Sequence, residues 1–264
     1  VVDGGVELLS ARQNFGVEIH GENRLATLIF AALLASGVTN TKFSIASRRK
    51  VSSIGDNDLG TGALRITDFG LNFTSRMEEL AREWSLFPTA SKNVKGTIST
   101  PIPERNLRVV VGTYPEDLID QLMRDRHDHL FVGQTSGGAA HVGPLVIPGN
   151  SPCMRCFSLG IHDRFGVAGF LPVSSDSLDI PVALTYQLAG VAVQSILQLI
   201  DTGNSELTGS RIGCEYTTPV ARQPLHIARH PLCLCQKITQ EISGKSTGGT
   251  LLKFAQNRQE TILF

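Results

Sequence analysis

Net charge and long apolar runs are both missing from this sequence. Its 24 basic residues balance its 24 acidic residues, so it lacks the strong positive field that holds a nucleic-acid backbone, and we expect no nucleic-acid partner. No uninterrupted apolar run reaches the roughly 20 residues of a membrane span, so we expect none. Disorder is excluded because 41% of the residues are hydrophobic and only 18% are charged. The 264 residues suit one large α/β domain with, at most, a small appendage.

Cysteine is scarce, but its spacing is informative. Four of the five cysteines form two tight pairs, Cys153-x-x-Cys156 and Cys233-x-Cys235, and Cys214 is left over. An odd count fits a reducing compartment, and we expect the protein in the cytoplasm. Disulfides between such near neighbours are usually strained, whereas both sulfurs of each pair can bind one tetrahedral ion. We therefore predict a structural zinc ion bound by all four paired cysteines, with four buried thiols as the alternative.

Apolar segments and turn residues alternate along most of the chain. Residues 15–20 are predicted as a strand that ends at Gly21, residues 25–35 as an apolar helix, and residues 42–47 as a second strand. Strand–helix alternation of this kind predicts a Rossmann-like, doubly wound and mostly parallel sheet, with an antiparallel extension later in the chain. The remaining expected elements are helices at 75–83, 115–126 and 180–199 and strands at 107–112, 129–133, 139–148 and 211–218.

The ends of the chain differ in character from its middle. Residues 1–14 form an N-terminal segment that could be the remnant of a truncated N-terminal region, because the sequence lacks a starting methionine. Residues 15–236 hold the predicted elements and both cysteine pairs. Residues 237–264 are a polar C-terminal tail. We therefore expect one α/β domain with a short segment on each side.

The cysteine motifs point to a known family. The run from Gly143 to Cys156 reads G-x-x-x-x-P-G-x-x-P-C-x-x-C, and residues 230–235 read H-P-x-C-x-C. Together with the first strand–helix–strand unit, they resemble the ThiF/MoeB/HesA adenylyltransferases, which are related to ubiquitin-activating enzymes. The resemblance is strongest to an actinobacterial ThiF-like branch. It covers about residues 17–235 and implies a Rossmann-like fold with a zinc site.

The same resemblance implies an ATP site, but its first motif is altered. In the family a G-x-G-x-x-G loop binds the phosphates with backbone N–H groups at a helix N-terminus. Gly21 matches the first glycine here, whereas Asn23 and Ala26 stand in place of the other two. A side chain at the second position obstructs the approach of the phosphate. Arg24 could compensate by contributing charge, although a solvent-facing role is the alternative.

Three further parts of the family's site are also changed. Ser47 stands where an acidic residue would bind the ribose, and it is followed by Arg48, which could bind an anion or lie in a solvated loop. Phe73 replaces the phosphate-binding lysine, although Arg76 three positions later could substitute for it. Residues 112–115 contain no acid where the family's Mg²⁺-binding aspartate is found. The resemblance thus implies a degenerate nucleotide site, and whether ATP and Mg²⁺ bind is left open.

We therefore expect a ThiF/MoeB-like protein with impaired ATP binding that binds a peptide or partner protein in a modification pathway. One alternative is an active ATP-dependent adenylyltransferase that activates the C-terminal carboxylate of a peptide or small protein. Another is a nucleotide-dependent oxidoreductase. No catalytic residue is assigned, and His141 could line the crevice or be structural. The candidate cofactor-binding residues are Gly21, Arg24, Ser47, Arg48, Arg76 and Gly143. Because relatives dimerise and helix 180–199 is apolar, we also expect a homodimer.

Overall fold

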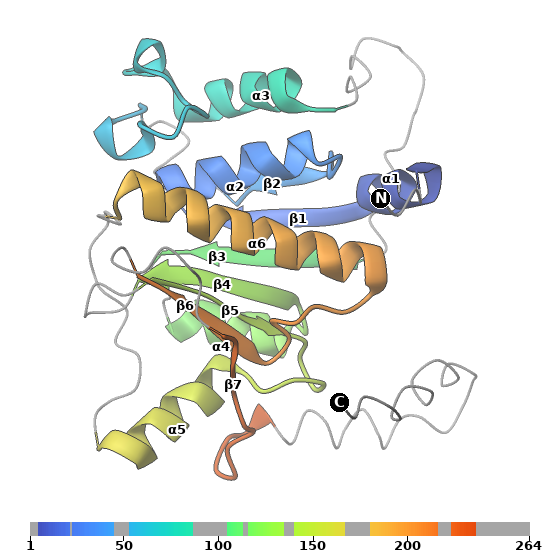
Figure 1. Cartoon of the computed structure of the whole chain (residues 1–264), viewed down its shortest axis with the longest axis vertical. Coiled ribbons are helices and arrows are strands. Elements are labelled where there is room, and N and C mark those ends of the chain that lie inside the picture. The colour runs from blue at the N-terminus through green and yellow to red at the C-terminus, as the bar shows by residue number, and fades with distance from the viewer. Residues whose placement is uncertain are drawn as a thin grey trace, which may run out of the picture.

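A computed structural model of the chain describes residues 5–21, 23–44, 53–86, 105–112, 116–134, 140–166, 180–215 and 223–235. These residues form one seven-stranded sheet with helices around it (Figure 1). The strands are β1 (Phe15–His20), β2 (Thr41–Phe43), β3 (Arg105–Val111), β4 (Asp128–Gln134), β5 (Ala140–Val146), β6 (Ser210–Cys214) and β7 (Leu225–His226). The helices are α1 (Gly5–Gln13), α2 (Arg24–Ala35), α3 (Phe73–Trp84), α4 (Glu116–Arg124), α5 (Met154–Phe165) and α6 (Val182–Thr202), with short 3₁₀ turns η2 (Asp56–Asp58) and η3 (Ile66–Asp68).

The sheet combines a parallel part with an antiparallel part. Its strand order is β2-β1-β3-β4-β5-β6-β7. Strands β2, β1, β3 and β4 run parallel, and β5, β6 and β7 are added antiparallel beyond β4. The predicted mixed α/β fold, with a mostly parallel sheet and an antiparallel extension, is therefore confirmed.

Alternate residues of the central strands face two separate cores. On β3, Val109 and Val111 belong to the larger core, whereas Val110 between them belongs to the smaller core. Helices α2 and α6 cover the larger core, and α2 contributes an almost wholly buried set of apolar side chains. The smaller core contains residues of α4 and α5 together with the four paired cysteines. The cysteines thus belong to the core on the opposite side of the sheet from α2 and α6.

Several element boundaries differ from those predicted. Helices α1 and α5 were not expected: α1 buries none of its side chains, and α5 has a weak apolar pattern. Strand β2 has three residues, so Ser44 of its predicted span is not in the strand, and residues 45–47 of that span lie outside the described residues. Helix α6 is 21 residues long, and an 18-residue window within it has a mean hydropathy of 1.4, so its length and composition would suffice for a membrane span. Half of that 18-residue window is nevertheless buried in the fold, as in a core helix.

Candidate metal centre and nucleotide-binding edge

Two segments that are distant in sequence bring the four paired cysteines together. Cys153 is the N-cap residue of α5 and Cys156 lies in the first turn of that helix. Cys233 and Cys235 follow β7, after the turn at 230–233. All four side chains are buried, with exposed fractions of 6% or less. Helix α5 and the segment after β7 therefore meet at these sulfurs.

The spacing of the four sulfurs suits a single tetrahedral metal ion. All four lie within 4.8 Å of one another. The Sγ–Sγ distances are 3.5 Å for Cys153–Cys233, 3.4 Å for Cys156–Cys235 and 3.9 Å for Cys153–Cys156. Zinc–sulfur bonds of about 2.3 Å in a tetrahedron place the sulfurs roughly 3.8 Å apart. The four cysteines are free thiols in this structure, so the donor set fits a soft divalent ion.

The thiols differ strongly in acidity because they hydrogen-bond one another. Hydrogen bonding from the Cys153 thiol, together with a backbone donor from His230, lowers the pKa of Cys156 to about 4. The same Cys153–Cys156 bond and burial raise the pKa of Cys153. Burial and its neighbouring thiols raise the pKa of Cys235 to about 12. Metal binding would therefore have to displace thiol protons from this cluster.

His230 contacts both halves of the cysteine cluster. Its Nε2 lies 2.8 Å from Oδ2 of Asp163 in α5, and its Nδ1 accepts from the backbone N–H of Leu232 at 3.2 Å. His226, four residues before His230, lies on β7, where its Nδ1 is 2.6 Å from Oγ of Ser210.

The predicted nucleotide site lies at the edge where β1 and β3 end. Gly21 follows β1, and a side chain there would come within 2.8 Å of the carbonyl oxygen of Val111, so the close approach of the two strand ends requires glycine. Asn23 is the N-cap residue of α2, and its Oδ1 accepts from the backbone N–H of Ala26 at 3.0 Å. The backbone N–H of Ala26, which could otherwise donate to a phosphate at this helix N-terminus, is therefore already hydrogen-bonded to the Asn23 side chain.

The two described arginines of the predicted nucleotide site also have protein partners. Arg24 donates to the carbonyl oxygen of Ile180. Arg76 is buried in α3, where its Nε donates to Oδ1 of Asp68 at 2.9 Å and its NH1 to Oε1 of Glu83 at 2.9 Å. Hydrogen bonds to Glu83 and Asp68 raise the pKa of this guanidinium. Both arginines bridge segments of the chain in this structure.

The other candidate residues are distributed more widely. Ser47 and Arg48 lie outside the described residues. Gly143 lies inside β5, where a side chain would collide with the carbonyl oxygen of Ser210 on β6. His141 is fully buried near the start of β5, opposite Gly133, and burial holds its pKa well below the usual value. Of the described candidates, Gly21 and Arg24 follow β1 at the edge of the sheet, whereas Gly143 lies within β5 and Arg76 is paired in α3.

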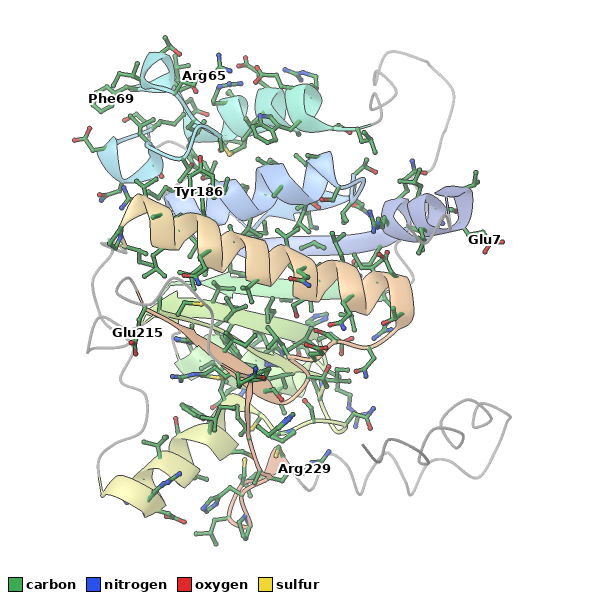
Figure 2. All side chains as sticks on the ribbon, in the orientation of Figure 1. Glu7, Arg65, Phe69, Tyr186, Glu215 and Arg229 are labelled. Carbon is green, nitrogen blue, oxygen red and sulfur yellow. The ribbon has the colours of Figure 1, made fainter. Side chains whose placement is uncertain are left out.

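A groove runs along α6 on the other side of the sheet from the cysteines. It has a volume of about 830 Å³ and lies between α6, α2 and the segment around Thr61. Tyr186 projects from α6 towards that segment (Figure 2), and its hydroxyl donates to the carbonyl oxygen of Thr61 at 2.5 Å. The groove is lined by Leu28, Ala32, Thr61, Gly62, Trp84, Tyr186, Ala189, Gly190, Val193, Gln194, Leu197, Gln198 and Asp201.

Comparison with known proteins identifies a shared fold. No known protein family and no curated protein matches the sequence. Among solved structures, Escherichia coli MccB in complex with MccA-N7isoASN has a TM-score of 0.62 at 17% identity over 88% of this chain and 69% of that one. The Microcin C7 biosynthetic enzyme MccB in complex with N-formylated MccA has a TM-score of 0.59 at 16% identity, covering 87% and 70%. PaaA has a TM-score of 0.56 at 14% identity, covering 84% and 76%.

Proposed function

We propose that this chain is a ThiF/MoeB-like protein of Rossmann-like fold that binds a peptide or partner protein and whose ATP site is impaired. Two independent lines support the family assignment. The cysteine motifs resemble those of the family's actinobacterial branch, and the fold is shared with MccB. The structures of MccB with MccA favour a peptide as the partner. We also propose a cytoplasmic location, which the five free cysteines support.

The observation that carries the impaired ATP site is the cap on α2. Phosphate binding at a helix N-terminus needs free backbone donors and nearby positive charge. Asn23 occupies the N–H of Ala26, while Arg24 and Arg76 donate to partners within the chain. Anchoring a triphosphate here would require these bonds to be broken. Each lost contact to transition-state charge can cost about 3 kcal/mol of barrier, so adenylation would be very slow.

A thermal-shift titration with ATP and Mg²⁺ tests this proposal, because a ligand that binds only the folded state raises its melting temperature. We expect no ATP-dependent shift and no pyrophosphate exchange with carboxylate peptides. Arg24→Ala is the matched variant, because Arg24 is the first residue of α2, directly after the N-cap. A clear exchange signal that Arg24→Ala abolishes would overturn the proposal and favour the active adenylyltransferase, for which the structure of MccB with ATP is the precedent.

The four cysteines are proposed to bind one structural zinc ion. Four thiolate ligands fill a tetrahedral shell, so no position stays open for water or substrate. Cys153 and Cys156 would bind from α5, and Cys233 and Cys235 from the segment after β7. The ion would supply a cross-link between these segments and no chemistry on a substrate.

The groove along α6 favours a homodimer. Tyr186, Gly190, Val193 and Leu197 form a stripe at helical spacing along one side of α6. Gly190 lies inside the helix, yet a side chain there would meet no atom within 4 Å. Of the described residues that line the groove, only Asp201 is charged, and Arg12 neutralises it. Because an uncharged stripe does not repel a second copy of itself, we propose that two chains pair through this groove.

A further inference from the structure

We infer that Asp163 and His230 form a brace that holds the second cysteine pair in place before a metal binds, and so sets how tightly the metal is held. This inference goes beyond the proposed function and rests on the proposed metal alone. Its basis is the set of contacts that the His230 side chain and backbone make with α5 and with the turn that leads to Cys233.

The first part of the argument is the position of Asp163. Cys156 and Asp163 both lie on α5, seven residues apart. Seven residues make nearly two helical turns, so both face the same side, about 10.5 Å apart along the axis. One face of α5 thus carries a sulfur of the cluster and, two turns later, a carboxylate that can hold an incoming segment.

The second part is the number of bonds that His230 makes. Its backbone N–H donates to the sulfur of Cys156, and its carbonyl accepts from the N–H of Cys233 at 3.0 Å. Its Nδ1 accepts from the N–H of Leu232, which leaves Nε2 as the donor to Asp163 at 2.8 Å. None of these four contacts involves a metal ion. The turn is therefore fixed to α5 by the protein's own groups.

The third part is the exposure of the two leucines next to these cysteines. Leu232 is 79% exposed and Leu234 is 59% exposed, so the apolar side chains beside the cysteines bury little surface. The neighbouring Arg229 adds one polar contact, from NH2 to the carbonyl oxygen of Gly149 at 2.9 Å (Figure 2). Burial in the smaller core holds the side chains of Cys233 and Cys235, while the polar contacts fix the backbone of the turn that carries them.

The brace should matter for metal affinity because ordering a free segment costs about 1–2 kcal/mol per residue. If the turn at 230–233 is already ordered, binding the metal requires less ordering. Partners that orient metal ligands typically change affinity about 10–100-fold when removed. We therefore expect Asp163→Ala to weaken zinc binding about tenfold.

The test is zinc competition against a chromophoric chelator with the full chain. Asp163→Ala is compared with Asp163→Asn, which keeps an acceptor oxygen for Nε2 of His230. The zinc affinity of Asp163→Asn should fall by less than about threefold. His162→Ala, a change at the exposed neighbouring residue on α5, is the control and should match the wild type. If Asp163→Ala binds zinc within about twofold of the wild type, the brace does not set metal affinity and the inference is wrong.

A second measurement separates the brace from the metal. In metal-free protein, hydrogen exchange at the amides of Leu232 and Cys233, which both donate to His230, should be slower in the wild type than in Asp163→Ala. Equal exchange in the two proteins would show that the turn is not held before the metal arrives. If the wild type binds no zinc, the metal proposal fails, and this comparison alone then decides whether the brace exists.

Discussion

Replacing Arg76 with alanine should destabilise the protein severely without affecting its response to ATP. The Arg76–Asp68 pair is buried, with only 9% of each side chain exposed. Removing one partner of such a pair leaves an unpaired buried charge and typically costs about 3–5 kcal/mol. Oδ2 of Asp68 would keep its hydrogen bond from the N–H of Arg65 at 2.8 Å, so we expect a cost at the lower end of that range. Glu83 is 54% exposed, so its bond to Arg76 adds at most about 1 kcal/mol.

The expected loss in the free energy of unfolding of Arg76→Ala is therefore about 3 kcal/mol, which corresponds to a fall of about 6–12 °C in melting temperature for a domain of this size. Urea unfolding of Arg76→Ala measures it directly, with Glu83→Ala as the control that should lose less than about 1 kcal/mol. The double variant Asp68→Ala/Arg76→Ala should be less unstable than the sum of the single variants, because no charge is left unpaired. A loss below about 1 kcal/mol in Arg76→Ala would refute the assignment of this arginine to a buried structural pair.

Three other predictions follow from the structure. Elemental analysis should find one zinc ion per chain, and Cys233→Ser should lower both zinc content and melting temperature, whereas an unchanged zinc content would contradict the four-thiolate site. Gly190→Arg should shift the protein from dimer to monomer in sedimentation at micromolar concentration while leaving its melting curve intact, and a wild type that is already monomeric would disprove the dimer. Burial lowers the pKa of His129 to about 4, so its unfolded form binds a proton that the folded form does not between about pH 6.5 and 4. Stability should therefore fall as the pH drops through that range, and His129→Phe should flatten the decline in urea unfolding at successive pH values.

The sequence predicted the helices and strands that are marked by a clear run of apolar residues. Helices α2 and α6 and strand β3 were anticipated because their sequences are rich in apolar residues. Helix α5 was missed because its apolar pattern is weak. The cysteine cluster was predicted because four thiols in two pairs have few other uses. It is now supported by their distances in the structure.

The rest depended on contacts between distant residues. Arg76 was expected as a possible substitute for the phosphate-binding lysine, yet its guanidinium pairs with Asp68 and Glu83. Glu79, which lies three residues after Arg76 on α3 and 3.5 Å from it, was the available signal for an internal ion pair. Asp163 and His230 are 67 residues apart, and no local pattern joins them. Sequence alone therefore identified candidate residues, but not which of them were already paired.

The position of the cysteine cluster has a mechanical consequence. The chain runs on from Cys235 for 29 more residues. A force applied to the chain beyond Cys235, for example by an energy-dependent unfoldase, acts on the four cysteines before it reaches β6 or β5. With a metal bound, the load falls on thiolate bonds anchored in α5. Without it, the load falls on the burial of Cys233 and Cys235 and on a few hydrogen bonds. Metal occupancy would thus determine how readily a force applied beyond Cys235 opens this segment.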